Sequence, residues 1–297
     1  MIDVAVVGGG PAGLTAANYL RRFHRSCLVL DSGKSRARWI PESNNCPGFP
    51  GGVSGDELLA RLRRQAAAAE VPIETATVER IVRASDGDGF VVHAGERSWR
   101  ARMVMIATGL RDRLPGDWAE QAMSCGALRL CPICDAFEVS DRHIGVYGHG
   151  ADIGSHARFL RTFSASVTAL PLDGDDGGEE GAAARAEGVR WMDGGTLEFD
   201  DGRCVFRCNG KATPFDTVYC FLGFETSVPV DGLALERTRS GEIVVDRHQQ
   251  TATRGLYAIG DIVGGLNQIS VAVGQAAAAA THAHGQLPAS PRAAEAA

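Results

Sequence analysis

Two glycine-rich turns, at residues 8–13 and 148–154, constrain the fold of this chain more than any other feature. Each turn follows a short apolar run and precedes a helical pattern, as in the strand-turn-helix of a parallel sheet. In the first turn, Gly8 permits the tight bend, Gly10 lets a phosphate approach the backbone, and Gly13 lets the helix lie close to the strand. The chain is therefore expected to have an α/β fold with two Rossmann-like nucleotide-binding lobes.

The first turn belongs to a complete β-α-β unit. Residues 2–7 are the expected strand, residues 12–23 the helix, and residues 27–30 a second strand that ends at Asp31. The carboxylate of Asp31 could accept bonds from both ribose hydroxyls of a dinucleotide, and it would repel a 2′-phosphate. The pyrophosphate would then lie at the helix N-terminus, whose exposed amides favour an anion. The alternative, an ordinary tight turn without a ligand, is disfavoured by this context.

The same strand and helix patterns recur along the rest of the chain. A loop at 38–55 is expected first, followed by an amphipathic helix at 55–70 with Arg61, Arg63 and Arg64 outward, a hairpin around Val91 and Trp99, and a strand at 103–106. A second β-α-β unit is expected at 144–170, followed by a solvated acidic loop at 173–181. The chain then ends with a strand from Leu256 and a final helix at 270–282, with a frayed tail from Gln286. Two lobes that interrupt one another imply two three-layer domains, the second inserted into the first. We place the first domain at residues 1–112 and 241–297 and the inserted domain at 113–240.

The strongest chemical motif is Cys131-Pro132-Ile133-Cys134, with Asp135 directly behind it. This spacing brings two sulfurs together at the start of a helix, which lowers the pKa of one thiol. The resulting thiolate can attack a disulfide, and the second sulfur can resolve the mixed disulfide. Asp135 can carry the proton that each thiolate gains or loses. Alternatively, Asp135 simply caps the helix that begins here.

The remaining cysteines are not expected to form a disulfide framework in a chain of this length. Cys27 and Cys220 lie in apolar runs and are interpreted as small buried hydrophobes. A zinc site that joins Cys204 and Cys208 to the pair at 131 and 134 is disfavoured, because the two pairs lie far apart in the sequence. No metal site is predicted.

Composition excludes several kinds of partner. The formal net charge of −6 and the pI of about 5.8 argue against a nucleic-acid or anionic-membrane surface. No apolar run reaches the roughly 20 residues that a membrane-spanning helix needs. The first expected strand begins at Ile2, which leaves no room for a targeting segment, so a cytoplasmic location is expected.

A second piece of sequence favours FAD over NAD. Gly260-Asp261 ends a late strand, where the carboxylate could bind ribityl hydroxyls. Asn267-Gln268-Ile269-Ser270 then opens the last helix. A helix N-terminus directed at a flavin would stabilise the negative charge of the reduced ring.

With these motifs in place, the chain resembles the low-molecular-weight thioredoxin reductases over nearly its whole length. The matching segments, in family order and spacing, are Val6-Val7-Gly8-Gly9-Gly10-Pro11-Ala12-Gly13, Asn45-Cys46-Pro47-Gly48-Phe49, Ala107-Thr108-Gly109, Cys131-Pro132-Ile133-Cys134-Asp135 and Leu256-Tyr257-Ala258-Ile259-Gly260-Asp261. The resemblance implies a homodimer and an FAD domain split by an inserted lobe that carries the dithiol. It also implies that Cys134 faces flavin C4a, that Cys131 exchanges with a partner disulfide, and that Asp135 is the acid/base group.

The resemblance further implies a set of cofactor-binding residues. They are Gly8, Gly10, Pro11, Ala12, Gly13, Asp31, Ser32, Asn45, Val78, Ala107, Thr108, Gly109, Gly260, Asp261, Gln268 and Ile269.

The chain departs from the family at its second glycine turn. The family's next strand ends in a His-Arg-Arg cluster for the 2′-phosphate of NADPH, whereas Pro171, Leu172 and Asp173 stand at those positions here. None of these side chains can pair with a phosphate, and the acidic run behind them would repel it. Ile153 also stands where a third glycine or alanine is expected. NADPH use is therefore predicted to be poor.

Three functions fit this sequence. The leading one is an FAD-dependent, thioredoxin reductase-like disulfide oxidoreductase that acts on a thioredoxin-like protein or a small-molecule dithiol or disulfide. Ferredoxin or a second flavin, which serve NADPH-poor relatives, are the candidate electron donors. The first alternative is a dithiol oxidase that passes electrons from substrate thiols to oxygen. The second is a non-catalytic flavin/dithiol redox sensor.

Overall fold

The apolar runs around the first glycine turn form the centre of a seven-stranded sheet. Strands β1 (Ile2–Val7) and β2 (Cys27–Asp31) are largely buried, as expected for parallel strands covered on both faces. β1 lies between β2 and β6 (Arg97–Ile106), and all three run parallel. Two further parallel strands are β3 (Ile73–Thr75), which pairs with β2, and β17 (Leu256–Ala258), which pairs with β6. The last two strands, β4 (Arg80–Arg83) and β5 (Phe90–Ala94), are antiparallel to each other, and β5 also pairs with β6 in the antiparallel direction.

The register of this sheet gathers three of the predicted motifs at one edge. Val7 in β1 and Ala258 in β17 both pair with Ile106 in β6. Because these strands are parallel, the segments that follow them leave the sheet at the same edge. Those segments are the first glycine turn, Ala107-Thr108-Gly109 and Gly260-Asp261.

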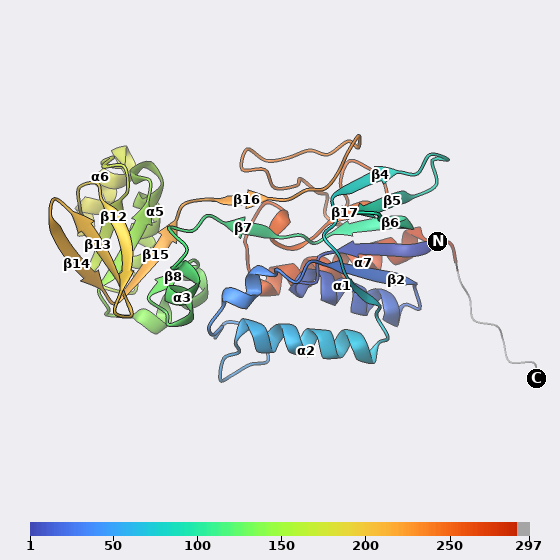
Figure 1. Cartoon of the computed structure of the whole chain (residues 1–297), viewed down its shortest axis with the longest axis horizontal. Helices are drawn as coiled ribbons and strands as arrows, with labels where there is room; N and C mark the ends of the chain where they lie inside the picture. Colours follow the sequence, from blue (N-terminus) through green and yellow to red (C-terminus); the bar gives the residue numbers. More distant parts are fainter. Residues whose placement is uncertain (290–297) are drawn as a thin grey trace, which may run out of the picture. The chain divides into compact units, whose positions relative to one another are not determined.

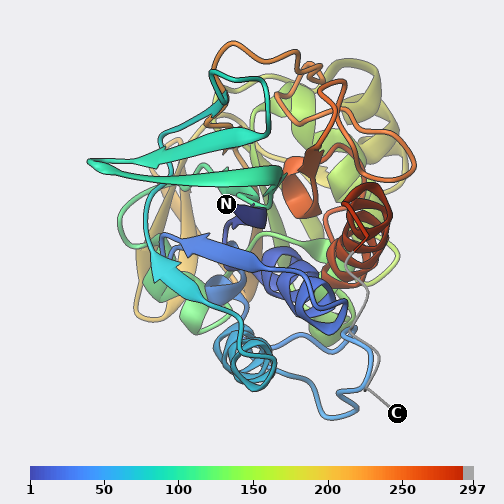
Figure 2. The same ribbon diagram turned by 90° about the vertical axis from the view of Figure 1, so that its right-hand side faces the viewer.

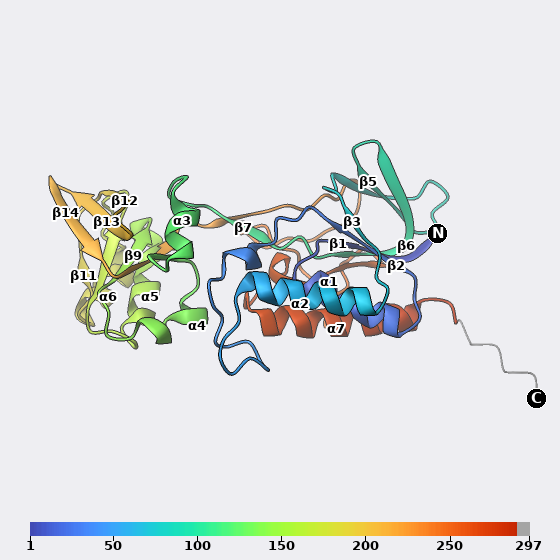
Figure 3. The same ribbon diagram turned by 60° about the horizontal axis from the view of Figure 1, so that its bottom comes forward.

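Three helices cover one face of this sheet, and Figures 2 and 3 show them on the same side of the strands. They are α1 (Pro11–Arg22), α2 (Gly55–Ala68) and α7 (Ile269–Gln286). α7 buries a row of alanines at helical spacing and packs along α1. On the opposite face, residues of β4, β5 and the segment 228–245 contribute to a second apolar core.

A five-stranded parallel sheet forms around the second glycine turn, in the order β11-β10-β9-β15-β8. Helices α5 and α6 pack on one face, and α3 with the antiparallel meander β12-β13-β14 packs on the other. Many of these elements are labelled in Figure 1. Their bounds are α3 (Ala119–Ser124), β8 (Leu128–Arg129), β9 (Ile144–Gly148), α5 (Gly150–Leu160), β10 (Val167–Pro171), α6 (Gly178–Ala186), β11 (Arg190–Trp191), β12 (Thr196–Asp200), β13 (Arg203–Cys208), β14 (Lys211–Phe215) and β15 (Thr217–Phe221).

This computed structural model describes residues 1–289, which divide into two compact units. The predicted fold class, two Rossmann-like α/β domains, is confirmed. The chain passes between the units at β7 (Leu110–Asp112) and β16 (Phe224–Thr226), which pair with each other. Unit 1 comprises Met1–Ala37, Asp56–Leu110 and the chain from Thr226 onward, and unit 2 comprises Arg38–Gly55 and Arg111–Glu225.

These bounds differ in three places from the domain boundaries predicted from the sequence, the smallest being residues 111–112, which group with unit 2. Residues 226–240 group with unit 1, because Val230 bridges to Ile81 of β4 and packs against the unit 1 core. Residues 38–55 group with unit 2, where the amide of Asn45 donates to a carbonyl of the dithiol loop. Segments that are loops in the sequence are thus assigned by their tertiary contacts.

The acidic stretch at 173–181 is not a purely solvated loop, as the sequence suggested. Its aspartates accept hydrogen bonds from backbone N–H groups, and α6 begins inside it at Gly178. At the other end of the chain, residues 290–297 of the predicted frayed tail lie outside the described residues. Within residues 1–289, no helix combines the length and the apolarity that crossing a membrane requires.

Candidate active site

Cys131 and Cys134 form a disulfide in unit 2, with their Cα atoms 5.3 Å apart. The helix that begins here, α4 (Pro132–Asp135), is a single turn, and a 3-10 turn (Phe137–Val139) follows it. A helix this short has a small dipole, so it does little to lower a thiol pKa. α4 therefore contributes little to a lowered thiol pKa, and nearby charged side chains become more important.

Asp135 is held by two side chains from neighbouring strands. Arg129 at the end of β8 donates from Nη1 to Asp135 Oδ2 at 2.5 Å, and the hydroxyl of Tyr219 in β15 donates to Oδ1 at 2.7 Å. All three side chains are largely or fully buried. Since Asp135 ends α4 and both oxygens bond side chains, the capping interpretation of this residue is wrong.

The surroundings of Asp135 act on its proton affinity in opposite directions. Burial raises the pKa of Asp135 above its ordinary value, and this effect is the largest. The guanidinium of Arg129 and the hydroxyl of Tyr219 lower the same pKa, while the nearby charge of Glu138 raises it slightly. Burial also raises the pKa of Tyr219 far above its usual range, so this hydroxyl stays protonated. Asp135 is thus the titratable group of this cluster.

In unit 1, the glycines of the first turn have distinct physical roles. A Cβ at Gly8 would lie 2.2 Å from the Ala107 carbonyl oxygen, and one at Gly13 would lie 1.9 Å from the Gly8 carbonyl oxygen. These two glycines therefore bring α1, β1 and the end of β6 together. A Cβ at Gly10 would meet only Ser35 Oγ, at 3.3 Å, among the described residues. Apart from this close side-chain oxygen, no other atom from elsewhere in residues 1–289 lies within 4 Å of that position, which leaves room for a phosphate to approach.

Pro11 and Ala12 begin α1 directly after this turn, and the first turn of the helix contains no acidic residue. A missing N–H at the first helical position costs nothing, because that group has no helical partner. The positive end of the helix dipole is left uncompensated by a carboxylate in this first turn. The N-terminus of α1 thus fits an anion.

Asp31 is buried at the end of β2. Its Oδ1 accepts from the N–H groups of Gly9 at 3.3 Å and Gly33 at 3.0 Å, and its Oδ2 pairs with Arg63 at 2.6 Å. Arg63 is exposed, as predicted, but its guanidinium also reaches the buried Asp31. Because a carboxylate oxygen can accept two bonds, Oδ2 keeps capacity for a ribose hydroxyl beside Arg63.

The late motif lies next to the glycine turn. A Cβ at Gly260 would lie 3.0 Å from the Cβ of Ala12, so the segment after β17 contacts the start of α1. Asp261 follows in a 3-10 turn (Gly260–Ile262) and pairs with Arg36 at 3.4 Å. Gln268 directly precedes α7, which begins at Ile269.

The remaining predicted residues are divided between the units. Thr108 and Gly109 follow β6, and the Thr108 hydroxyl donates to the Ser227 carbonyl at 2.8 Å. Ser32 is exposed after β2, and Val78 is buried in the unit 1 core. Asn45 is grouped with unit 2, where its amide donates to the Ile133 carbonyl at 3.3 Å. The cofactor roles of all these residues remain predictions.

The second glycine turn contrasts with the first. Asp173 Oδ1 accepts from the Gly150 N–H at 3.1 Å, directly at the N-terminus of α5, and Oδ2 contacts His149 Nδ1 at 3.0 Å. Partial burial would raise the pKa of Asp173, but the bonds from Gly150, His149 and Asp175 lower it overall. A carboxylate of the chain itself therefore accepts from the first N–H group of α5, one of the groups that a bound phosphate would use.

The glycines of this second turn are explained by packing within unit 2. A Cβ at Gly150 would lie 2.2 Å from the Asp175 carbonyl oxygen, and one at Gly148 would lie 2.8 Å from Ile153 Cγ2. A Cβ at Gly154 would lie 2.8 Å from the backbone carbonyl carbon of Glu180 in α6. Each glycine thus allows a close approach of protein to protein, with no ligand needed to explain it.

Replacing Gly154 with alanine is expected to destabilise the protein by about 1–3 kcal/mol, because the added methyl group collides with α6. Thermal unfolding should show a lower melting temperature. Gly285→Ala is the matched control, since that glycine lies in α7 with no atom near the added Cβ and alanine favours helix. A melting temperature that rises in Gly154→Ala would contradict the packing role.

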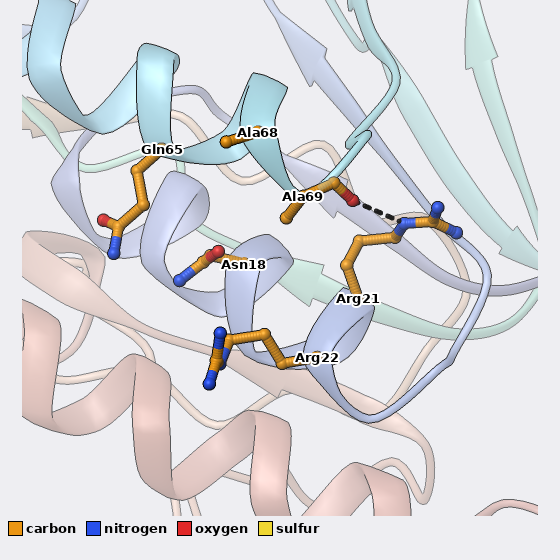
Figure 4. A pocket seen from close by; sticks show the side chains of 6 residues that line it. All are labelled: Asn18, Arg21, Arg22, Gln65, Ala68 and Ala69. Carbon is orange, nitrogen blue, oxygen red and sulfur yellow. Dashed lines mark hydrogen bonds between the residues drawn. The ribbon is translucent and has the colours of Figure 1, made fainter.

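A surface pocket lies between α1 and α2, and Figure 4 shows it from close by. Arg21 lines it and donates to the Ala69 carbonyl at 3.0 Å. None of the predicted site residues lines this pocket, so it is distinct from the candidate active site. The other lining residues are Asn18, Arg22, Gln65 and Ala68.

Sequence reasoning missed Arg129, Tyr219 and the ion pair of Arg63. Tyr219 lies in the buried strand β15, and a buried tyrosine hydroxyl needs a hydrogen-bond partner, so a polar neighbour could have been expected there. Arg129 and Arg63 offered none beyond their charge. Among residues 1–289, no group of three His, Cys, Asp or Glu side chains is arranged to hold a metal ion, and Cys204 and Cys208 lie buried in β13.

Comparison with known proteins gives one family and several close folds. The family model described as pyridine nucleotide-disulphide oxidoreductase matches residues 2–276. A thioredoxin reductase of Listeria innocua is 28% identical, over 95% of this chain and 92% of that protein. The crystal structure of thioredoxin reductase from Streptococcus pyogenes superposes with a TM-score of 0.86 at 25% identity, covering 96% of this chain and 97% of that one. That of an oxidoreductase from Agrobacterium tumefaciens gives 0.81 at 27% identity, with 96% and 98% covered.

Proposed function

Because the chain belongs to the pyridine nucleotide-disulphide oxidoreductases, among the low-molecular-weight thioredoxin reductases, we propose that it exchanges electron pairs between FAD and a substrate disulfide or dithiol. The Cys131–Cys134 pair is the redox group that contacts the substrate. Unit 1 holds the FAD, and a donor other than NADPH or NADH supplies electrons for disulfide reduction. The observation that carries this proposal is the contrast between the open first glycine turn and the second, which Asp173 fills.

The thiol chemistry follows from the two sulfurs. In the reduced pair, the thiolate of Cys131 attacks a substrate disulfide, forms a mixed disulfide and releases one substrate thiolate. The thiolate of Cys134 then attacks Cys131, which restores the Cys131–Cys134 disulfide and releases the second substrate thiolate. Both substrate thiolates leave with protons, and Asp135 is the nearby group that can give or take one.

The residues of unit 1 fit FAD at its adenosine end. The open space beside Gly10 and the start of α1 would hold the pyrophosphate, and Asp31 would hold the ribose through Oδ2. Asp261, beside the start of α1, would contact the ribityl chain. When bound, FAD would accept and donate the electron pair.

The residues of unit 2 do not fit a pyridine nucleotide. Asp173 takes the N–H at the start of α5, and Asp175 occupies the space that a Cβ at Gly150 would enter. A pyrophosphate would have to displace a carboxylate and then lie among further aspartates, which is electrostatically unfavourable. Ferredoxin and a second flavin are the candidate electron donors, because neither needs a dinucleotide to bind at the second glycine turn.

The test is anaerobic flavin bleaching. We expect that NADPH or NADH, at millimolar concentration, leaves the visible flavin band unchanged over minutes, whereas dithiothreitol bleaches it through the disulfide. Sodium dithionite is the control that shows the flavin can be reduced.

Rapid bleaching by NADPH would refute the proposal that Asp173 keeps a pyridine nucleotide out of the second glycine turn. A colourless protein that takes up no added FAD would refute the flavin site instead. Fast reoxidation of the dithiol-reduced protein by oxygen, with stoichiometric peroxide, would favour a dithiol oxidase over a reductase.

Thioredoxin reductases are among the proteins that match, so a thioredoxin-like protein is the first partner to test, with small-molecule disulfides next. Ile133 and Phe137, which are 52% and 78% exposed, place apolar surface near the disulfide in the sequence. We also propose a homodimer, which light scattering of the purified protein would test.

A further inference from the structure

The ion pair of Arg129 and Asp135 places two charged side chains in the interior of unit 2, where removing them from water costs free energy. Their side chains are 19% and 14% exposed, and Arg129 Nε is buried without a hydrogen-bond partner among the described residues. A buried ion pair is often no more stable than an apolar replacement of the same volume. An orphaned buried donor likewise calls for an explanation other than stability.

The geometry explains what this arrangement achieves. Arg129 and Tyr219 come from β8 and β15, which pair in parallel, and each occupies one oxygen of Asp135. The carboxylate is therefore fixed in place immediately after Cys134. A group that must give or take a proton works best when it is held in one orientation.

We infer that Arg129 and Tyr219 are positioning residues, which hold the Asp135 carboxylate and set the pH at which it exchanges a proton with the Cys131–Cys134 pair. This inference rests on the proposed function of the dithiol and Asp135. The charged and titratable groups around Asp135 are Arg129 from β8, Tyr219 from β15 and Glu138 from the 3-10 turn. Arg129 and Tyr219 favour the ionised carboxylate, and Glu138 opposes it.

The experiment measures thiol-disulfide exchange without a flavin donor. Protein reduced with dithiothreitol and then desalted is mixed with an aromatic disulfide that releases a coloured thiolate, and the rate is recorded against pH. Asp135→Asn should abolish the acidic limb of the profile. Arg129→Met should move that limb to higher pH by about one pH unit or more, because an adjacent cation is lost. Tyr219→Phe should move it in the same direction by less.

A double variant separates this role from a direct effect of Arg129 on the thiols. In the Asp135→Asn background, Arg129→Met should cause no further change in the pH profile, because the group through which it acts is gone. Arg129→Lys, which keeps the cation, should leave the limb near its wild-type position. An equal shift with and without the Asp135 carboxylate would overturn the inference.

Two controls are a substitution of the exposed Glu138 and the melting temperature of each variant. Glu138→Gln should move the limb slightly to lower pH, opposite to Arg129→Met. If Arg129→Met and Tyr219→Phe only lower the melting temperature and leave the limb in place, their role is structural and the inference fails. Because the assay needs no flavin, it gives the same answer if the proposed FAD site proves wrong.

Discussion

Replacing Cys134 with serine is expected to lower the rate of flavin reduction by dithiothreitol by about three orders of magnitude or more. Under the proposed function, electrons from this dithiol reach the flavin only after the Cys131–Cys134 disulfide is opened, and a serine hydroxyl cannot form a disulfide. Cys131→Ser should have an effect of the same size, because each sulfur is needed in every cycle. Anaerobic stopped-flow absorbance of the flavin band measures both variants.

The two variants should differ in the adduct they form with an aromatic disulfide. In Cys134→Ser, the thiolate of Cys131 attacks the disulfide and the mixed disulfide cannot be resolved, so mass spectrometry should detect it. Cys131→Ser should accumulate much less of this adduct if Cys131 is the exchanging sulfur. Cys125→Ser is the matched control, since Cys125 is an exposed free cysteine of the same unit, and it should behave as wild type in flavin reduction. A Cys134→Ser protein that retains a tenth of wild-type flavin reduction would contradict the assigned role.

Replacing Gly10 with aspartate is expected to reduce bound flavin at least about tenfold while the fold is retained. The change places a carboxylate at the N-terminus of α1, as Asp173 already does at α5, and this carboxylate would repel the pyrophosphate. Gly10 has extended backbone angles at the helix N-cap, where aspartate is a favoured residue, so the helix itself should not suffer. Flavin released on denaturation, measured per chain, gives the result.

Gly95→Asp is the control for this substitution. Gly95 lies in the turn between β5 and β6 with no atom near a Cβ, and its left-handed backbone is one that aspartate tolerates better than most residues. It should bind flavin as wild type does. Circular dichroism should show the same secondary structure in Gly10→Asp and wild type, although loss of the ligand will lower the melting temperature. Full flavin occupancy in Gly10→Asp would exclude the N-terminus of α1 as the pyrophosphate site.

Much of the fold was predictable because its signals are local. Gly8 and Gly13 allow close backbone contacts that only glycine permits, and the apolar runs before them are long enough to identify buried strands. The acidic stretch was misjudged for a different reason. Its aspartates look solvated in sequence, but Asp173 finds its partner 23 residues away at Gly150.

The sequence by itself determined the two β-α-β units, the spacing that lets Cys131 and Cys134 form a disulfide, and the lack of basic side chains at residues 171–173. These depend on residues close together in the chain. Only the tertiary structure decided which glycine turn stays open and which side chains hold Asp135. Tyr219 reaches Asp135 across 84 residues, and a hydrogen bond between such distant positions exists only once β8 and β15 have paired.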